Sequence, residues 1–170
     1  MTDNDSSIGR EETGARRPPR PLRRWMQVVG AFYLLQFVMM AIVRAPIRTF
    51  GPKGALDLAE AGDPVASFLV DTWTTFGLEV ASVGVMVLVA SRRAELARGV
   101  VLTVLAIEVG RGLVLDGYMI ARGIHVAGYA VWIAIHSLVI LTGLRALRTG
   151  RGAESAAVAT TAAMPAASGA

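Results

Sequence analysis

The chain has 170 residues, of which 54% are hydrophobic and only 18% are charged, and its mean hydropathy is +0.52. This is more apolar than a soluble domain needs, so the composition favours a membrane protein. Cysteine is absent, which excludes disulfides, thiolate metal sites and thiol redox chemistry. The net charge of +4 does not indicate nucleic-acid binding, because the basic residues stand beside apolar segments, where the insertion machinery reads them.

The first part of the chain contains a polar tail, an apolar run and a loop. Residues 1–24 are basic and rich in proline, which predicts a disordered tail. Residues 25–43 are apolar except for Gln36 and match the roughly 20 residues that cross a ~30 Å hydrocarbon core. A cleaved signal peptide is disfavoured, because the run is too long and no small-residue cleavage site follows it. Residues 44–64 predict a loop that has room for one short interfacial helix at 53–61.

Three further apolar runs follow the loop. Residues 65–90, 99–120 and 124–144 are each long enough to cross a bilayer as a helix, with tilt in the case of the first. The chain ends in an Ala-, Thr- and Ser-rich segment, 149–170, which predicts a second disordered tail. The expected fold is therefore all-α: a polytopic membrane four-helix bundle over residues 25–148.

The basic residues predict how this bundle lies in the cell membrane. Eleven of them fall near the helix ends on one side, and four fall on the other. The first group is Arg16, Arg17, Arg20, Arg23, Arg24, Arg92, Arg93, Arg98, Arg145, Arg148 and Arg151, and the second is Arg44, Arg48, Lys53 and Arg122. Because cytoplasmic loops carry the excess of Arg and Lys, we expect a multi-pass cell-membrane protein with both termini in the cytoplasm.

Ionisable residues within these apolar runs are the main functional signal, because a charge near the bilayer centre is costly and rare. They form one stripe on each of two predicted helices, since residues four apart share a helix face. The stripes are Asp71, Thr75 and Glu79 on the second helix and Glu108, Gly112 and Asp116 on the third. Arg111 stands beside the second stripe.

Simple antiparallel pairing predicts which of these residues share a depth. If the second and third helices turn near residues 92–94, Asp71 lies level with Asp116, and Glu79 lies level with Glu108. The same construction around the next turn places His136 level with Glu108. The sequence therefore predicts two layers of paired acids, with His136 beside the deeper layer.

Such layers favour acid–base chemistry. Two carboxylates at one depth in a low-dielectric site cannot both ionise cheaply, so one of each pair is expected to hold a proton. Arg111 would stabilise the ionised form of its neighbour Glu108. The candidate catalytic residues are thus Glu79, Glu108, Asp116, Arg111 and Asp71. The candidate substrate-binding residues are Trp73, Trp132 and His136, and the sequence predicts neither a metal site nor a cofactor.

In its compact helical architecture and buried acids, the stretch 25–148 resembles the small integral-membrane terpene cyclases. The resemblance implies an enzyme that protonates a prenyl or terpenoid substrate entering from the bilayer, leading to cyclisation or isomerisation. Glu79, Glu108 or Asp116 would then be the acid, and Arg111 would tune it. The implied partners are a lipophilic small molecule and membrane lipid, with a homo-oligomer left open.

Two alternatives remain open at the level of sequence. The paired acids would also suit a small proton- or ion-coupled transporter, although no inverted repeat or broken helix supports one. In the other alternative, Glu108 and Arg111 form a structural ion pair that fixes helix register in a non-catalytic membrane assembly protein.

Overall fold

The computed structural model describes the backbone of residues 17–162, and the side chains of residues 17–150 and 152. The described residues form helices and no strands, so the all-α expectation is confirmed. The helices are α1 (Arg20–Phe37), η1 (Val38–Ile42), α2 (Ala45–Phe50), α3 (Ala55–Glu60), α4 (Pro64–Ala90), α5 (Ala94–Ile107), η2 (Glu108–Leu115), α6 (Asp116–Ala121) and α7 (Val126–Ala162). Here η1 and η2 are π-helical segments that continue the helices before them.

Three of the described helical segments are long and apolar enough to cross a membrane. They are Arg20–Ile42, Pro64–Ala90 and Val126–Gly150, with mean hydropathies of 1.7, 1.6 and 1.8. Large apolar side chains cover their outer surfaces, as at Val28 and Phe68, which are 69% and 73% exposed. A surface of this kind is suited to lipid, because water would make it an aggregation site. The structure thus supports a membrane protein.

The observed helix ends differ from the predicted ones at both termini of the described chain. Helix α1 begins at Arg20, inside the predicted tail 1–24, because Pro21 is tolerated in a first turn. Helix α7 continues through the start of the predicted tail 149–170 to Ala162, since the Ala-rich segment has high helix propensity. The rest of both predicted tails, residues 1–16 and 163–170, lies outside the described residues.

The segment predicted as a loop contains two short helices. Helix α3, Ala55–Glu60, confirms the short helix expected at 53–61, whereas α2, Ala45–Phe50, was not expected. Helix α4 then begins with Pro64 in its first turn, and the Asp63 carboxylate accepts a 2.8 Å hydrogen bond from the backbone N–H of Ala66. Both features stabilise a helix start.

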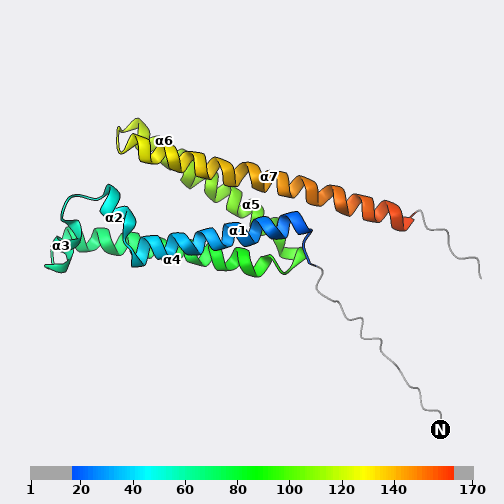
Figure 1. Ribbon diagram of the computed structural model, residues 1–170, viewed down its shortest axis with the longest axis horizontal. Helices are drawn as coiled ribbons and strands as arrows, with labels where there is room; N and C mark the ends of the chain where they lie inside the picture. The colour runs from blue at the N-terminus through cyan, green and yellow to red at the C-terminus, as the bar shows by residue number, and fades with distance from the viewer. Residues whose placement is uncertain (1–16, 163–170) are drawn as a thin grey trace, which may run out of the picture.

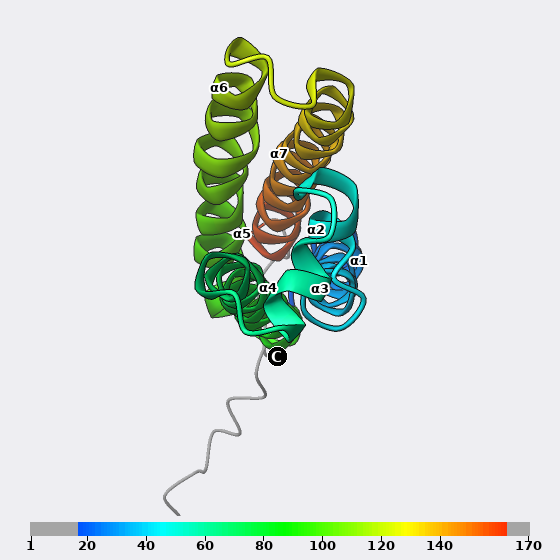
Figure 2. The ribbon, with the colours of Figure 1, turned by 90° about the vertical axis from the view of Figure 1, so that its left-hand side faces the viewer.

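The long segments pack as two pairs: α1 with α4, and the continuous segment α5–η2–α6 with α7 (Figure 1). Helix α4 packs along α1, while α7 packs along η2 and α6 and also touches α1. The view along the helices shows α2 and α3 beside the same end as the α6–α7 turn (Figure 2). The α1–α4 pair and the α6–α7 pair diverge toward that end, as Figure 1 shows.

The apolar core lies where the two pairs meet, toward the opposite end. Met26, Val80, Val87, Val101 and Val104 are fully buried there. Helices α1 and α4 approach closely at two glycines: a Cβ added to Gly84 would lie 3.0 Å from the carbonyl oxygen of Gly30. Small residues allow this close contact between helices that cross a membrane.

Candidate functional site

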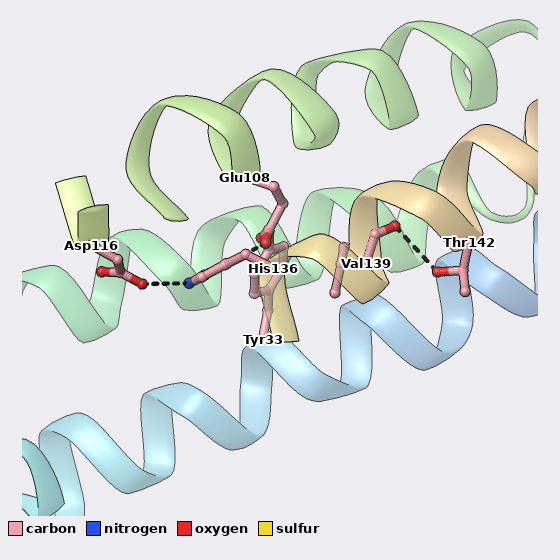
Figure 3. A network of polar contacts seen from close by, with 6 residues as sticks. All are labelled: Tyr33, Glu108, Asp116, His136, Val139 and Thr142. Carbon is pink, nitrogen blue, oxygen red and sulfur yellow. Dashed lines mark hydrogen bonds and ion pairs between the residues drawn. The ribbon is translucent and has the colours of Figure 1, made fainter. Parts of the chain in front are cut away.

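His136 lies between the carboxylates of Glu108 and Asp116 (Figure 3). Its Nδ1 is 2.5 Å from Oε2 of Glu108, and its Nε2 is 3.5 Å from Oδ2 of Asp116. The Tyr33 hydroxyl donates a hydrogen bond to the other oxygen of Glu108. The network therefore joins α1, η2, α6 and α7 through four side chains.

Burial makes these contacts costly to lose. Tyr33, Glu108 and Asp116 are 4%, 2% and 8% exposed. A buried carboxylate is tolerated only with partners, and Glu108 has one on each oxygen. Asp116 is less well satisfied, because its Oδ2 has no hydrogen-bond partner in the part of the chain that the structure describes, and the 3.5 Å to His136 is too long for a hydrogen bond.

Gly112 makes the central position of His136 possible. A Cβ at residue 112 would overlap the imidazole ring, with Cγ, Nδ1 and Cδ2 of His136 as the nearest atoms. The ring thus occupies the space that a side chain would fill. The sequence pattern placed Gly112 between Glu108 and Asp116 on one helix face. The structure shows why a glycine is needed there: the His136 ring fits between the two carboxylates only because residue 112 has no side chain.

Two π-helical segments flank the site. Segment η2 carries Glu108 and Arg111 and ends at Leu115, next to Asp116, while η1 carries Met39 and Met40. Such segments are rare and occur frequently at functional sites, where they re-aim side chains that a regular helix would place elsewhere. The apolar runs predicted regular helices at both places and did not indicate these segments.

One of the sequence alternatives was an ion pair between Glu108 and Arg111, and the structure does not contain this pair. Among the described side chains, both ion pairs within 4.0 Å involve His136, and neither involves Arg111. The Arg111 guanidinium instead lies over the ring of Phe76 on α4, with Cζ 3.3 Å from the ring centroid. This is a cation–π contact, which leaves the guanidinium N–H groups free of carboxylates in the described chain.

A cavity of about 530 Å³ opens beside the network, where the two helix pairs diverge. Its wall includes the network residues Tyr33, Glu108, Asp116 and His136, together with Arg111 and Gln36. Aromatic side chains form much of the remainder: Phe32, Phe50, Trp73, Phe76, Tyr129 and Trp132. A mostly apolar cavity with a few convergent polar groups is the usual form of a small-molecule site.

The predicted substrate-binding residues all line this cavity. Trp73 packs edge-on against Phe76 with ring centroids 5.7 Å apart, and Trp132 lies 5.8 Å from the His136 ring. The sequence predicted that His136 lies at the same depth as Glu108, and the direct contact between the two side chains confirms this. The structure thus brings Trp73, Trp132 and His136 together around the same space.

Asp71 and Glu79 are not part of the site, and the two predicted layers of paired acids are wrong. Both side chains are exposed, and neither lines the cavity. The pairing argument assumed that the second and third helices stay together along their length. Helix α4 instead turns its buried face, including Val80 and Gly84, toward α1, and that leaves the Asp71 and Glu79 stripe outside.

Tyr33 and Gln36 are site residues that the sequence pattern did not single out. Tyr33 completes the network from α1, and Gln36 lies one turn further along the same helix in the cavity wall. Their spacing of three in an apolar run, which puts them on one face, was the available signal. Within residues 17–150, no group of three His, Asp or Glu side chains is arranged to hold a metal ion.

Fold and site together define an all-helical membrane protein in which a buried histidine–carboxylate network faces an apolar cavity. The chain belongs to the BphX-like family, whose family model matches residues 19–152 and so includes every residue of the network. This is not a terpene cyclase family, so the resemblance to small integral-membrane terpene cyclases is wrong. No curated protein and no solved structure matches the chain.

Proposed function

We propose that the chain is a multi-pass protein of the cell membrane that crosses the bilayer four times with both termini in the cytoplasm. The fourth crossing is the continuous segment α5–η2–α6, which runs beside α7 and carries the charged residues of the site. Arg17, Arg23 and Arg92 line a second cavity of about 580 Å³, so basic residues of the N-terminal segment and of the α4–α5 turn gather at one end. That grouping is what the positive-inside rule expects of a cytoplasmic end.

Within this topology we propose an enzyme that transfers protons to and from a lipophilic small molecule. The observation that carries the proposal is the position of His136, held by Glu108 and facing Asp116 in the wall of a largely apolar cavity. General acid–base catalysis needs a proton donor and a proton acceptor that are fixed next to the substrate.

In this proposal each member of the network has a role. An ionised Glu108 can only accept hydrogen bonds, so it takes one from the Tyr33 hydroxyl and one from Nδ1–H of His136. The arrangement matches the carboxylate that orients the histidine in a catalytic triad. Nε2 is then directed toward Asp116, and in this proposal one of these two groups carries the proton that is exchanged.

Asp116 and His136 would exchange that proton with the substrate. Protonation of the substrate at one atom, followed by loss of a proton from another, returns the pair to its starting state. Neither a cofactor nor a thiol is needed for this step. Tyr33 and Glu108 act through His136, because they keep its ring and its tautomer fixed.

The lining of the cavity supports entry from the bilayer. Leu35, Met39 and Leu115 belong to the wall, yet they are 57%, 41% and 49% exposed. The apolar interior is therefore continuous with the apolar outer surface of the helices. A lipophilic molecule can move between the acyl-chain region and the site without crossing water.

Hydrogen exchange in D2O tests this function even while the substrate is unidentified. Membranes that contain the protein are incubated in D2O with the host lipid extract, and the lipids are screened by mass spectrometry for deuterium in C–H positions. We expect at least one lipophilic compound to gain deuterium with the parent protein and to lose most of that gain with Glu108→Gln and with His136→Gln.

Glu79→Gln is the matched control, because it makes the same change at an exposed carboxylate outside the cavity. It should exchange deuterium like the parent. Equal labelling by the parent, Glu108→Gln and His136→Gln, or no labelling above membranes that lack the protein, would contradict the proposed proton transfer.

A further inference from the structure

Three polar groups in the cavity wall have no hydrogen-bond partner among the described side chains, although Oδ2 of Asp116 lies at ion-pair distance from His136. Nε2 of Gln36 and Oδ2 of Asp116 are fully buried atoms on residues that are each 8% exposed. The third group is the Arg111 guanidinium, which contacts Phe76 but no carboxylate. Buried polar groups are rarely left unpaired, so Gln36 and Asp116 indicate a partner that comes from outside the chain, and the half-buried Arg111 guanidinium adds a positive charge in the same wall.

Gln36 and Arg111 lie at the same depth. Tyr33 and Glu108 touch, which sets a common level for α1 and η2. Both helices run in the same direction, away from the end where Arg17, Arg23 and Arg92 gather (Figure 1). Gln36 on α1 and Arg111 on η2 each lie three residues, about one turn, beyond this common level. Two donor groups therefore line the cavity at one level, which lies between the levels of Glu108 and Asp116 on the continuous segment η2–α6.

The Arg111 guanidinium and the Gln36 amide together favour a ligand with a negatively charged oxygen that accepts hydrogen bonds. A guanidinium and an amide N–H₂ both donate, and charge-assisted hydrogen bonds to an oxyanion are the strongest that they can form. Glu108 forms no ion pair with this guanidinium, and its two oxygens contact Tyr33 and His136. The remaining wall at this level is aromatic, with Trp73, Phe76 and Trp132.

We propose that the cavity binds an amphiphilic oxyanion, whose carboxylate or phenolate head group lies between Arg111 and Gln36 and whose apolar body lies among Trp73, Phe76 and Trp132. The proposal rests on the proposed function and names the class of its substrate. Asp116, further along the same helical segment than Arg111, lies in the same wall as His136, and both are placed next to the first atoms of the apolar body. The oxyanion binds, and the neighbouring atoms receive or lose the proton.

Tryptophan fluorescence gives a direct test, because two of the three tryptophans line the cavity and Trp25 does not. The purified full chain in detergent is titrated with 9,10-dibromostearate, which quenches nearby tryptophan, and with its uncharged methyl ester. A brominated phenol and its methyl ether form a second pair that distinguishes a phenolate from a carboxylate. The variant Trp73→Phe/Trp132→Phe measures the quenching of Trp25 that comes from partition into the detergent.

We expect one acid to bind about tenfold or more tightly than its neutral partner, in line with one charge-assisted hydrogen bond. Arg111→Gln should remove the difference, Arg111→Lys should retain part of it, and Gln36→Leu should reduce it. Thermal unfolding of each variant shows whether it is folded. The matched control Arg122→Gln, at an exposed position outside the cavity, should leave the difference unchanged.

The outcomes separate this inference from the proposed function. If acid and neutral partner bind equally to the parent, or if a folded Arg111→Gln keeps the preference, the oxyanion site is wrong while a lipophilic site stands. If none of the four compounds quenches Trp73 and Trp132, the oxyanion inference is wrong. In that case deuterium exchange in membranes still decides on the proposed proton transfer.

Discussion

The imidazole of His136 lies directly against Gly112, in space that any side chain at position 112 would occupy. We therefore expect Gly112→Ala to displace the ring and to break its contacts with Glu108 and Asp116. The proposed proton transfer should fall about as far as in His136→Gln, and overpacking should lower the free energy of unfolding by about 1–3 kcal/mol. Deuterium exchange and thermal unfolding measure the two effects.

Gly110→Ala provides the control for this substitution on the same segment. A Cβ at Gly110 meets nothing within 4 Å, so the change should leave activity intact. Its effect on stability should be small or favourable, because alanine has the higher helix propensity. Equal activity of Gly112→Ala and Gly110→Ala would show that the position of the histidine ring does not matter.

A second prediction concerns the hydroxyl of Tyr33, which donates to the buried carboxylate of Glu108. Tyr33→Phe removes this donor and leaves one carboxylate oxygen unpaired in the core. We expect a loss of about 1–3 kcal/mol in unfolding free energy, the usual cost of an unsatisfied buried group, together with reduced exchange activity. Tyr118→Phe is the matched control, since Tyr118 is 53% exposed. A parent-like melting temperature in Tyr33→Phe would contradict the hydrogen bond.

The contrast between His136 and Glu79 shows how far the sequence could predict the site. Both were placed by the same antiparallel pairing with Glu108. The prediction is confirmed for His136, because α7 stays packed against η2, and it is wrong for Glu79, because α4 turns to α1. Hydrophobic runs predict where apolar helices lie and their approximate ends. They do not predict which helices stay in contact, since apolar faces can pack against several partners.

Arg111 illustrates a second limit. Its spacing from Glu108 is compatible with an ion pair, yet its guanidinium lies over Phe76 on another helix. The π-helical segment η2 changes the direction in which its side chains point, and hydrophobic periodicity does not signal such a segment. Tyr33 and Gln36 were missed for a related reason, because Glu108, the partner of Tyr33, and most of the cavity wall around Gln36 come from helices distant in sequence.

A third prediction tests the close contact of α1 and α4. A Cβ at Gly84 would lie 3.0 Å from the carbonyl oxygen of Gly30, and that backbone atom cannot move aside easily. Gly84→Leu should therefore separate the two helices and lower the melting temperature of the purified protein, with a loss of about 1–3 kcal/mol. Gly99→Leu, where a Cβ meets nothing within 4 Å, should remain close to the parent. A loss that is equal for both substitutions would indicate a general effect of leucine, with no special role for the glycine contact.

The last prediction tests the proposed topology, which places the end of α7 and the α4–α5 turn on the cytoplasmic side. A reporter that fluoresces only in the cytoplasm should be bright when fused after Arg148 or inserted after Arg93, and dark when inserted after Lys53, between α2 and α3. The physical reason is the excess of arginine at the first two sites, which holds these ends in the cytoplasm during insertion. If α5–η2–α6 does not cross the bilayer, Arg93 and Arg148 lie on opposite sides, and one of the two bright fusions becomes dark. That result would overturn the four-span topology but leave the contacts within the site as they are.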